Sequence, residues 1–293
     1  MKVAIFGQYY QENSQRSIKE IFAFFKKRDV EVIVENIYYS VLREKNVLDQ
    51  THSTYTSPDD FDRETKLMIS IGGDGTILRA ATFVRDSGIP ILGVNTGRLG
   101  FLAKVQQENI ESYLQLILDG DYTLSARTVL SLHCSEEIPE LQLNFALNEI
   151  TVNRKDTTSM ITIETFLDGE YLNSYWADGL IISTPTGSTG YSLSCGGPVL
   201  MPEVDSLVIT PIAPHNLNAR PLVIPDSTEI RLKVSGRESQ YLVSLDSRRV
   251  AVANESILTI TKTPYKIMMV ELEGETFIKT LRNKLLWGQD KRN

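Results

Sequence analysis

A short glycine-rich segment occupies residues 69–76, with the sequence Ile-Ser-Ile-Gly-Gly-Asp-Gly-Thr. The apolar run that ends at Ile71 predicts a short buried strand, and the apolar pattern after the glycines predicts a helix. A glycine-rich turn between a strand and a helix lets backbone N–H groups approach a phosphate, and the helix dipole favours the negative charge. The segment therefore indicates an α/β fold with a candidate phosphate-binding turn, although a bare Asp-Gly turn is also common. The candidate phosphate-binding residues are Gly72, Gly73, Gly75 and Thr76.

Strands and helices are expected to alternate on both sides of this turn. Apolar runs at 2–6, 30–34 and 91–94 predict strands, and apolar residues at helical spacing around Ile18 and Leu114 predict helices. The polar segment 43–63 is predicted to be a loop or a mobile flap. Such an alternation is typical of a parallel sheet. We therefore expect an α/β nucleotide-binding domain with a parallel, Rossmann-like sheet at residues 1–123.

The pattern changes near Leu124, where helical periodicity almost disappears and short alternating runs take over. Asp168-Gly169 is a two-residue hairpin signal between two such runs. We expect an all-β, substrate-binding domain at residues 124–273, followed by a helical tail at 274–293 that packs back on the first domain. The candidate strands are 161–164, 171–176, 207–210, 230–234, 241–245, 257–261 and 267–270.

Composition limits the classes of partner. The chain has 293 residues and a net charge of −7, which argues against nucleic acid, because a nucleic-acid backbone requires a basic face. Two cysteines are too few for a disulfide framework and favour a reducing compartment. No apolar run approaches the roughly 18 residues of a membrane-spanning helix. We expect a cytoplasmic protein with no nucleic-acid or membrane partner.

Residues 178–198 form a second polar segment, with the sequence DGLIISTPTGSTGYSLSCGGP. A short apolar strand opens into many hydroxyl groups and glycines with almost no charge. Such groups can bind a polar, ring-bearing ligand by hydrogen bonds, although an ordinary Ser/Gly loop is the alternative. The pair Asn148-Glu149 offers a donor, an acceptor and a carboxylate side by side, which suits a ribose diol but also occurs in ordinary turns.

Several familiar site patterns are missing from the sequence. There is no G-x-x-x-x-G-K-[ST] phosphate loop, and Leu78 stands where the dinucleotide fingerprint G-x-G-x-x-G requires its third glycine. The three histidines, His52, His133 and His215, are scattered, so they give no support to a histidine metal site or a catalytic triad.

Taken together, these residues resemble the bacterial NAD kinases over most of residues 67–225. The glycine–aspartate turn is shared with diacylglycerol-kinase-like lipid kinases and phosphofructokinases. The pair Asn148-Glu149, the segment 178–198 and the segments 95–101 and 210–215 are specific to the family. Two positions depart from the family pattern: Gly190, where many members have Ala, and Ser247, where Gly or His is commoner.

The resemblance implies an enzyme that transfers a phosphoryl group from ATP to the 2′-hydroxyl of the adenosine ribose of NAD, with a divalent metal such as Mg²⁺. It also implies a sandwich-like C-terminal domain, a dinucleotide site between the domains, and a homodimer or homotetramer. By position, Asp74 would be the catalytic carboxylate. The NAD-binding residues would be Gly75, Arg79, Asn148, Glu149, Asp178, Thr189, Gly190, Tyr191, Ser192, Leu193, Ser194, Ala213 and Asp246. The metal ligands are not identified.

Two other functions remain open at this point. A lipid kinase with the same glycine turn would need an apolar groove, whereas residues 183–198 are mostly hydroxyl and glycine. A non-catalytic dinucleotide-binding sensor would share the binding residues and would differ only in an activity assay.

Overall fold

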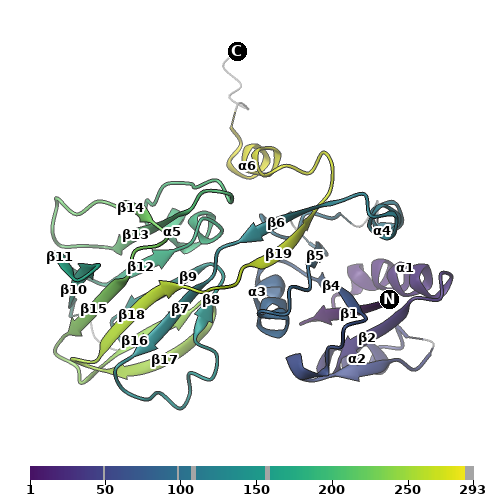
Figure 1. Ribbon diagram of the computed structural model, residues 1–293, viewed down its shortest axis with the longest axis horizontal. Coiled ribbons are helices and arrows are strands. Elements are labelled where there is room, and N and C mark those ends of the chain that lie inside the picture. The colour runs from purple at the N-terminus through teal and green to yellow at the C-terminus, as the bar shows by residue number, and fades with distance from the viewer. Residues whose placement is uncertain (49, 98, 107–109, 156–158, 288–293) are drawn as a thin grey trace. The chain divides into compact units, whose positions relative to one another are not determined.

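The computed structural model of the chain describes all residues except 49, 98, 107–109, 156–158 and 288–293. It divides into two compact units (Figure 1). Unit 1 comprises Met1–Ala126 and Ile267–Asn293, and unit 2 comprises Arg127–Lys266. Each unit has its own apolar core, so each is described separately.

Unit 1 is built on a seven-stranded sheet with the order β3-β2-β1-β4-β5-β19-β6. The pairs from β3 through β19 are parallel, as expected from the alternation of strands and helices. The strands are β1 (Lys2–Gly7), β2 (Glu31–Glu35), β3 (Ser53–Tyr55), β4 (Thr65–Ile71), β5 (Ile91–Val94), β6 (Thr123–Arg127) and β19 (Ile267–Glu271).

Helices cover both faces of this sheet. Val3 and Ile5 of β1 belong to one apolar cluster with side chains of α1, α2 and α4. Phe6 points to the other face and contacts Phe83 of α3, with 5.3 Å between the ring centroids. This alternation buries both faces of β1, which explains its continuous apolar sequence. The helical elements of unit 1 are η1 (Glu12–Ser14), α1 (Gln15–Lys26), α2 (Asn36–Glu44), η2 (Pro58–Asp60), α3 (Asp74–Val84), α4 (Ile110–Asp119) and α6 (Phe277–Leu285).

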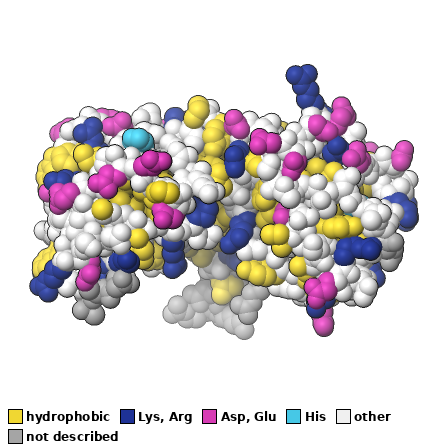
Figure 2. Space-filling view, turned by 90° about the horizontal axis from the view of Figure 1, so that it is seen from below, with side chains coloured by type: hydrophobic (Ala, Val, Ile, Leu, Met, Phe, Trp, Pro, Cys, Tyr) yellow, Lys and Arg dark blue, Asp and Glu magenta, His cyan; other side chains and the backbone are white. Residues whose placement is uncertain are grey.

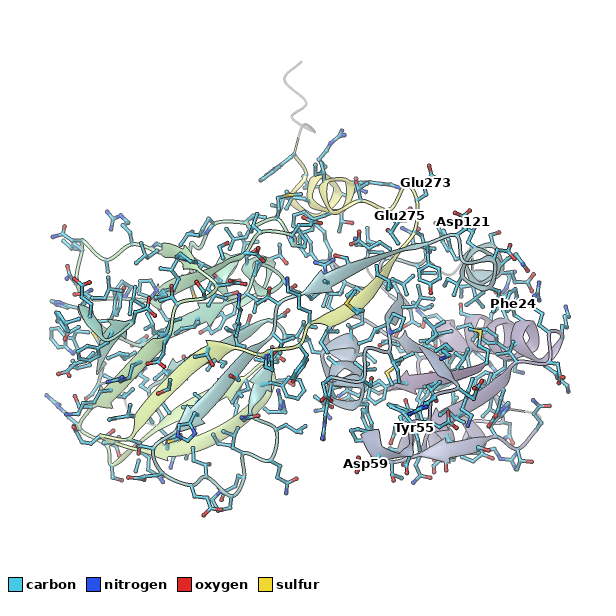
Figure 3. All side chains as sticks on the ribbon, in the orientation of Figure 1. Phe24, Tyr55, Asp59, Asp121, Glu273 and Glu275 are labelled. Carbon is cyan, nitrogen blue, oxygen red and sulfur yellow. The ribbon has the colours of Figure 1, made fainter. Side chains whose placement is uncertain are left out.

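The prediction of a loop or mobile flap at 43–63 missed three regular elements. This segment contains the end of α2, the edge strand β3 and the turn η2. Tyr55 is buried and donates a hydrogen bond from its hydroxyl to the Ile5 carbonyl at 3.0 Å, whereas Asp59 is exposed at the surface (Figure 3). An edge strand of three residues needs only one buried side chain, so its sequence shows no apolar run.

Unit 2 consists of two six-stranded sheets with an apolar core formed by side chains of both. Their orders are β11-β10-β15-β18-β7-β8 and β14-β13-β12-β9-β16-β17, and the described pairs are antiparallel. The turn Asp168-Gly169 joins β10 and β11 with φ values of 49° and 85°, which confirms the predicted hairpin. The elements are β7 (Leu130–Cys134), β8 (Phe145–Ala146), β9 (Glu149–Asn153), β10 (Ile161–Leu167), β11 (Glu170–Ala177), β12 (Gly179–Ser183), η4 (Gly187–Thr189), α5 (Tyr191–Ser194), β13 (Ser206–Ile212), β14 (Leu222–Pro225), β15 (Ile230–Ser235), β16 (Gln240–Leu245), β17 (Arg248–Ala253) and β18 (Ile257–Lys262).

The predicted boundaries at 123 and 273 differ from this division of the chain. The strand predicted at 267–270 was assigned to the β domain, but it is β19, which lies between β5 and β6 in the sheet of unit 1. An apolar strand pattern does not say which sheet the strand joins, because its partners are distant in sequence. The helical tail belongs to unit 1 as expected, and Phe277 contacts Phe101 with 6.1 Å between the ring centroids.

The surface has a mixed charge. On the face shown in Figure 2, basic and acidic side chains are interspersed. Within the described part of the chain, no helix combines the length and the apolar character that crossing a membrane requires.

Candidate active site

The glycine turn of unit 1 connects β4 to α3. Gly72 has a φ of 153°, and a Cβ built on it would overlap the side chain of Thr76, so this position requires glycine. Gly73 precedes the first residue of α3, and a Cβ on Gly73 or Gly75 would meet no atom within 4 Å. The backbone of Gly73 and Gly75 is therefore open to a ligand at the helix N-terminus. Thr76 is buried, and its side chain fills the space beside Gly72.

Asp74 holds a loop that lies far from it in sequence. Its carboxylate accepts hydrogen bonds from the backbone N–H groups of Phe101 at 2.8 Å, Leu102 at 3.0 Å and Ala103 at 3.0 Å. A Cβ built on Gly100 would overlap this carboxylate. The sequence suggested Asp74 as a catalytic group but not this anchoring role. In the sequence, only the resemblance of segment 95–101 to the NAD kinase family indicated that this loop matters.

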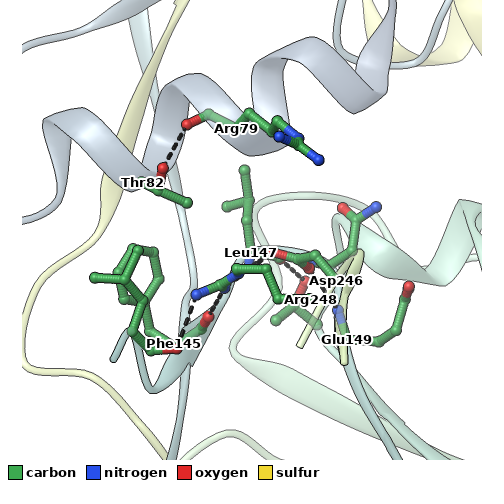
Figure 4. A network of polar contacts seen from close by, with 10 residues as sticks. Arg79, Thr82, Phe145, Leu147, Glu149, Asp246 and Arg248 are labelled. Carbon is green, nitrogen blue, oxygen red and sulfur yellow. Dashed lines mark hydrogen bonds and ion pairs between the residues drawn. The ribbon is translucent and has the colours of Figure 1, made fainter. Parts of the chain in front are cut away.

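Two other predicted positions lie near this turn. Arg79 is on the exposed side of α3, and its carbonyl accepts a hydrogen bond from the Thr82 hydroxyl at 2.7 Å (Figure 4). Asn95 fixes the start of the loop, because its Oδ1 accepts the N–H of Gly97 at 2.6 Å. Arg98, which belongs to the family segment 95–101, lies outside the described residues.

Asn148 and Glu149 lie at the start of β9 in unit 2. Their backbone is fixed on the β12 side, where the Thr184 N–H donates to the Asn148 carbonyl at 2.9 Å and Glu149 pairs with Ser183. The side-chain atoms Asn148 Oδ1 and Glu149 Oε2 are buried and have no hydrogen-bond partner among the described residues. Leaving a buried polar atom unpaired costs about 1–3 kcal/mol, so such atoms are rare in folded proteins. These two oxygens are therefore available to a ligand.

A cavity of about 260 Å³ adjoins Glu149. Burial raises the pKa of Glu149 to about 8, the negative charge of Asp246 adds to the rise, and the backbone N–H of Tyr191 opposes it. Glu149 is consequently an uncharged acid at neutral pH, able to donate a hydrogen bond as well as to accept one. The cavity is lined by Glu149, Thr151, Asn153, Tyr191, Leu242, Ser244, Asp246 and Arg249.

The predicted segment 189–194 reaches the same pair. A Cβ built on Gly190 would lie 3.3 Å from Glu149 Oε2 and 3.7 Å from Asn148 Nδ2. Tyr191 is exposed and lines the cavity, and Ser194 is also exposed. Leu193 is half-buried in the same short helix.

Two hydroxyl side chains of this segment serve the local fold. Ser192 is fully buried, and its hydroxyl shares a hydrogen bond of 2.8 Å with the Thr210 hydroxyl of β13. The Thr189 hydroxyl donates to the Thr186 carbonyl at 3.2 Å.

Asp246 occupies the two-residue turn between β16 and β17, with a φ of 52°. It lines the cavity, but its carboxylate accepts hydrogen bonds from the N–H groups of Leu147 at 3.0 Å, Asn148 at 2.8 Å and Glu149 at 3.3 Å. Arg248, which the sequence did not suggest, lies beside it (Figure 4). The structure thus brings Asn148, Glu149, Gly190, Tyr191 and Asp246 together.

Asp178 and Ala213 lie elsewhere in unit 2. Asp178 precedes β12, where it forms an ion pair with Arg154 at 3.2 Å. Ala213 follows β13 and has a φ of 43°. Both are at the end of the strand pair opposite to Ser183, the partner of Glu149. They lie beside the Asn153 end of the cavity, because Gly179 pairs with Asn153, and the charge of Asp178 acts on Tyr191.

Comparisons with known proteins identify the family of the chain. The ATP-NAD kinase N-terminal domain family matches residues 3–122, and the corresponding C-terminal domain family matches residues 147–272. The NAD kinase of Flavobacterium psychrophilum is 66% identical over 100% of both chains, and that of Bacteroides fragilis is 43% identical over 100% of both. This chain belongs to the NAD kinase family.

Two solved structures of the family share the fold. A yeast NADH kinase complexed with NADH has a TM-score of 0.88 and 26% identity, covering 100% of this chain and 89% of the other. An NAD kinase from Archaeoglobus fulgidus in complex with ATP has a TM-score of 0.75 and 27% identity, covering 97% of each chain. The NAD kinase resemblance is thus confirmed, and the lipid-kinase alternative loses its support.

Proposed function

We propose that this member of the NAD kinase family transfers the γ-phosphoryl group of ATP to the 2′-hydroxyl of the adenosine ribose of NAD, giving NADP. The observation that carries this proposal is the pair of buried, unpartnered oxygens, Asn148 Oδ1 and Glu149 Oε2. A ribose presents two neighbouring hydroxyls, each a donor and an acceptor. An amide and an uncharged carboxylic acid side by side can match both hydroxyls.

Asp74 is the proposed catalytic carboxylate. A carboxylate has about four lone-pair sites, and three backbone N–H groups already point at Asp74. The remaining site would accept the hydrogen bond of the reacting hydroxyl and orient it. Phosphoryl transfer depends mainly on such positioning and on charge stabilisation, so a rigid carboxylate suits the reaction.

The phosphates of the nucleotides are proposed to meet the N-terminus of α3. The open backbone at Gly73 and Gly75 and the partial positive charge of the helix end both favour an anion. Arg79 would contact the substrate from the exposed side of the same helix. Gly72 and Thr76 would act indirectly, because their side-chain space is used to shape the turn.

Magnesium is the proposed metal. The described residues contain no group of three or more His, Cys, Asp or Glu side chains that could hold a metal ion. Kinases commonly bind Mg²⁺ through one or two carboxylates together with water and substrate phosphates. The donor set of this chain fits a metal that arrives on ATP, where it would neutralise phosphate charge.

Localisation and assembly are also proposed. Cys134 and Cys195 are free thiols, which suits the reducing environment of the cytoplasm. We propose a homodimer or homotetramer in which Asp178 and Ala213 serve the dinucleotide site of a neighbouring chain.

The test is an assay with NAD, ATP and Mg²⁺ that follows NADP formation. NADH should be included as a second acceptor, because one neighbour in fold is an NADH kinase, and polyphosphate and other nucleoside triphosphates should be included as donors. NADP formation that requires NAD and a phosphoryl donor would support the proposal. Tight NAD binding without any product would instead indicate a non-catalytic dinucleotide sensor.

A further inference from the structure

A buried carboxylate holds the backbone of the residues that form the ligand-facing pair. The Asp246 side chain is only 4% exposed, and its two oxygens receive the N–H groups of three successive residues, Leu147 to Glu149. The Asp246 N–H returns a hydrogen bond to the Glu149 carbonyl at 3.0 Å. The turn between β16 and β17 is thereby fastened to the start of β9.

Arg248 binds the segment that precedes Leu147 to the same turn. Its guanidinium donates one hydrogen bond to the Leu143 carbonyl at 2.8 Å and another to the Phe145 carbonyl (Figure 4). The same group lies 4.0 Å from the Asp246 carboxylate and stacks over the Phe145 ring at 5.2 Å. A planar guanidinium can satisfy two carbonyls and a carboxylate at once, which a lysine ammonium does less well.

We propose that Asp246 and Arg248 are positioning residues, which hold the chain from Leu143 to Glu149 so that Glu149 faces the cavity and the unpartnered oxygens of Asn148 and Glu149 stay side by side. Asp246 then acts through the backbone of the pair instead of contacting the substrate itself. The proposal rests on the proposed function only in taking NAD as the ligand of this pair.

The same arrangement decides which carboxyl group carries a proton. Burial raises the pKa of Asp246, and its three N–H donors and the Arg248 guanidinium oppose that rise. Glu149 has one backbone donor and faces the Asp246 charge, and its pKa is about 8. Because Asp246 has three N–H donors and a guanidinium beside it and Glu149 has one donor, Glu149 holds a proton more readily than Asp246 does.

A pH dependence of ligand binding follows. Besides Asp246, the charged or titratable groups of unit 2 that line the cavity with Glu149 are Tyr191 of α5 and Arg249 of β17. Burial, with smaller contributions from acidic neighbours, raises the pKa of Tyr191 above its ordinary value, so its phenol stays neutral near pH 8. NAD affinity should consequently fall as the pH rises through about 8, because Glu149 then loses the proton with which it donates.

The first experiment replaces the guanidinium. Arg248→Gln should raise the Kd and KM for NAD by roughly tenfold, equivalent to about 1.4 kcal/mol, with little change in the KM for ATP. Arg248→Lys should lie between this variant and the wild type. The matched control is Arg231→Gln, which removes another strand arginine of unit 2 that pairs with an exposed carboxylate, and it should bind NAD normally. An Arg248→Gln protein with wild-type NAD affinity would overturn the proposal.

The second experiment measures NAD affinity as a function of pH, because a purely structural role of Asp246 would not alter that dependence. In Glu149→Gln, the NAD affinity, whatever its value, should no longer fall as the pH rises through about 8, because the amide donates at every pH. Asp246→Asn should shift that weakening to lower pH, because it removes the charge that raises the Glu149 pKa. An unchanged profile in Asp246→Asn would count against the proposal.

A third measurement needs no ligand. Hydrogen exchange at the N–H groups of Leu147, Asn148 and Glu149 should be faster in Arg248→Gln than in Arg231→Gln. Equal exchange rates would refute the positioning role. If the wild type binds no NAD, the proposed function fails, and the exchange rates still decide this inference.

Discussion

The carboxylate of Asp74 holds a loop and, in the proposed mechanism, also orients the substrate hydroxyl. In Asp74→Asn, the amide nitrogen cannot accept any of the three backbone N–H groups that the carboxylate accepts. We expect turnover to fall by roughly 10²–10⁴-fold, the range for a lost acid–base group, with little change in NAD affinity. Steady-state kinetics and calorimetry with NAD would measure both effects.

A matched control for Asp74→Asn is available in the same unit. Asp62 also accepts backbone N–H groups, from Glu64 at 3.0 Å and Thr65 at 3.1 Å. Asp62 lies before β4, at the opposite end of this strand from the glycine turn. Asp62→Asn should keep its turnover. Near-normal turnover in Asp74→Asn would remove Asp74 from the mechanism.

The amide of Asn148 gives a prediction about binding. Asn148→Ala should weaken NAD binding by about 1–3 kcal/mol, because the ligand group that it met would be left unpaired. The KM for ATP should change less. Asn173→Ala, which removes a half-buried amide of β11, is the control. Calorimetry that shows equal NAD affinity for both variants would contradict the ribose assignment.

At the residue scale, the sequence identified side chains whose chemistry matches a ligand but missed the residues that hold them. Asn148 and Glu149 stood out because a donor, an acceptor and a carboxylate are adjacent. Gly100 and Arg248 could not be recognised in this way. Their partners, Asp74 and Phe145, lie 26 and 103 positions away, and only the folded chain brings them together.

At the scale of elements, periodicity located most strands correctly, because it reports which faces are buried. It failed where burial on a face was not the deciding property. The edge strand β3 exposes Ser53 and Thr54 and buries only Tyr55, so its sequence appeared to be a loop. The strand β19 was found, but its position beside β5 depends on a contact with a strand about 175 residues earlier.

The loop after β5 offers a test of how an element positions a side chain. A Cβ on Gly100 would overlap the Asp74 carboxylate, so Gly100→Ala must move either the loop or Asp74. A shift of about 1 Å can cost up to about 10²-fold in rate, and we expect kcat to fall by up to that factor. Gly97→Ala lies in the same loop and adds a Cβ that meets no atom within 4 Å, so it should keep its kcat. Equal kcat values for the two variants would show that the loop does not position Asp74.

At the scale of the whole molecule, the predicted NAD-binding residues of unit 2 fall into two groups. Asp178 lies five positions before Ser183, which pairs with Glu149. At about 3.3 Å per strand residue, roughly 16 Å of β12 separates the two ends. A dinucleotide site that uses both groups either spans this length within one chain or is shared between two copies, and closed symmetric dimers are the commonest such assembly.

Complementation between two inactive variants tests this sharing of the site. If Asp74 acts from one chain and Asp178 from its partner, Asp74→Asn and Asp178→Ala should each be poor enzymes alone. A mixed dimer places both lesions in one of its two sites and leaves the other site intact. By symmetry, up to about half of the sites of the mixed dimers should therefore be active in the co-refolded protein.

Each variant refolded alone is the control. If the mixture recovers nothing beyond its parents, both residues serve from the same chain or the enzyme works as a monomer. Sedimentation of the wild type distinguishes these, because a sharing mechanism requires at least a dimer at the assay concentration.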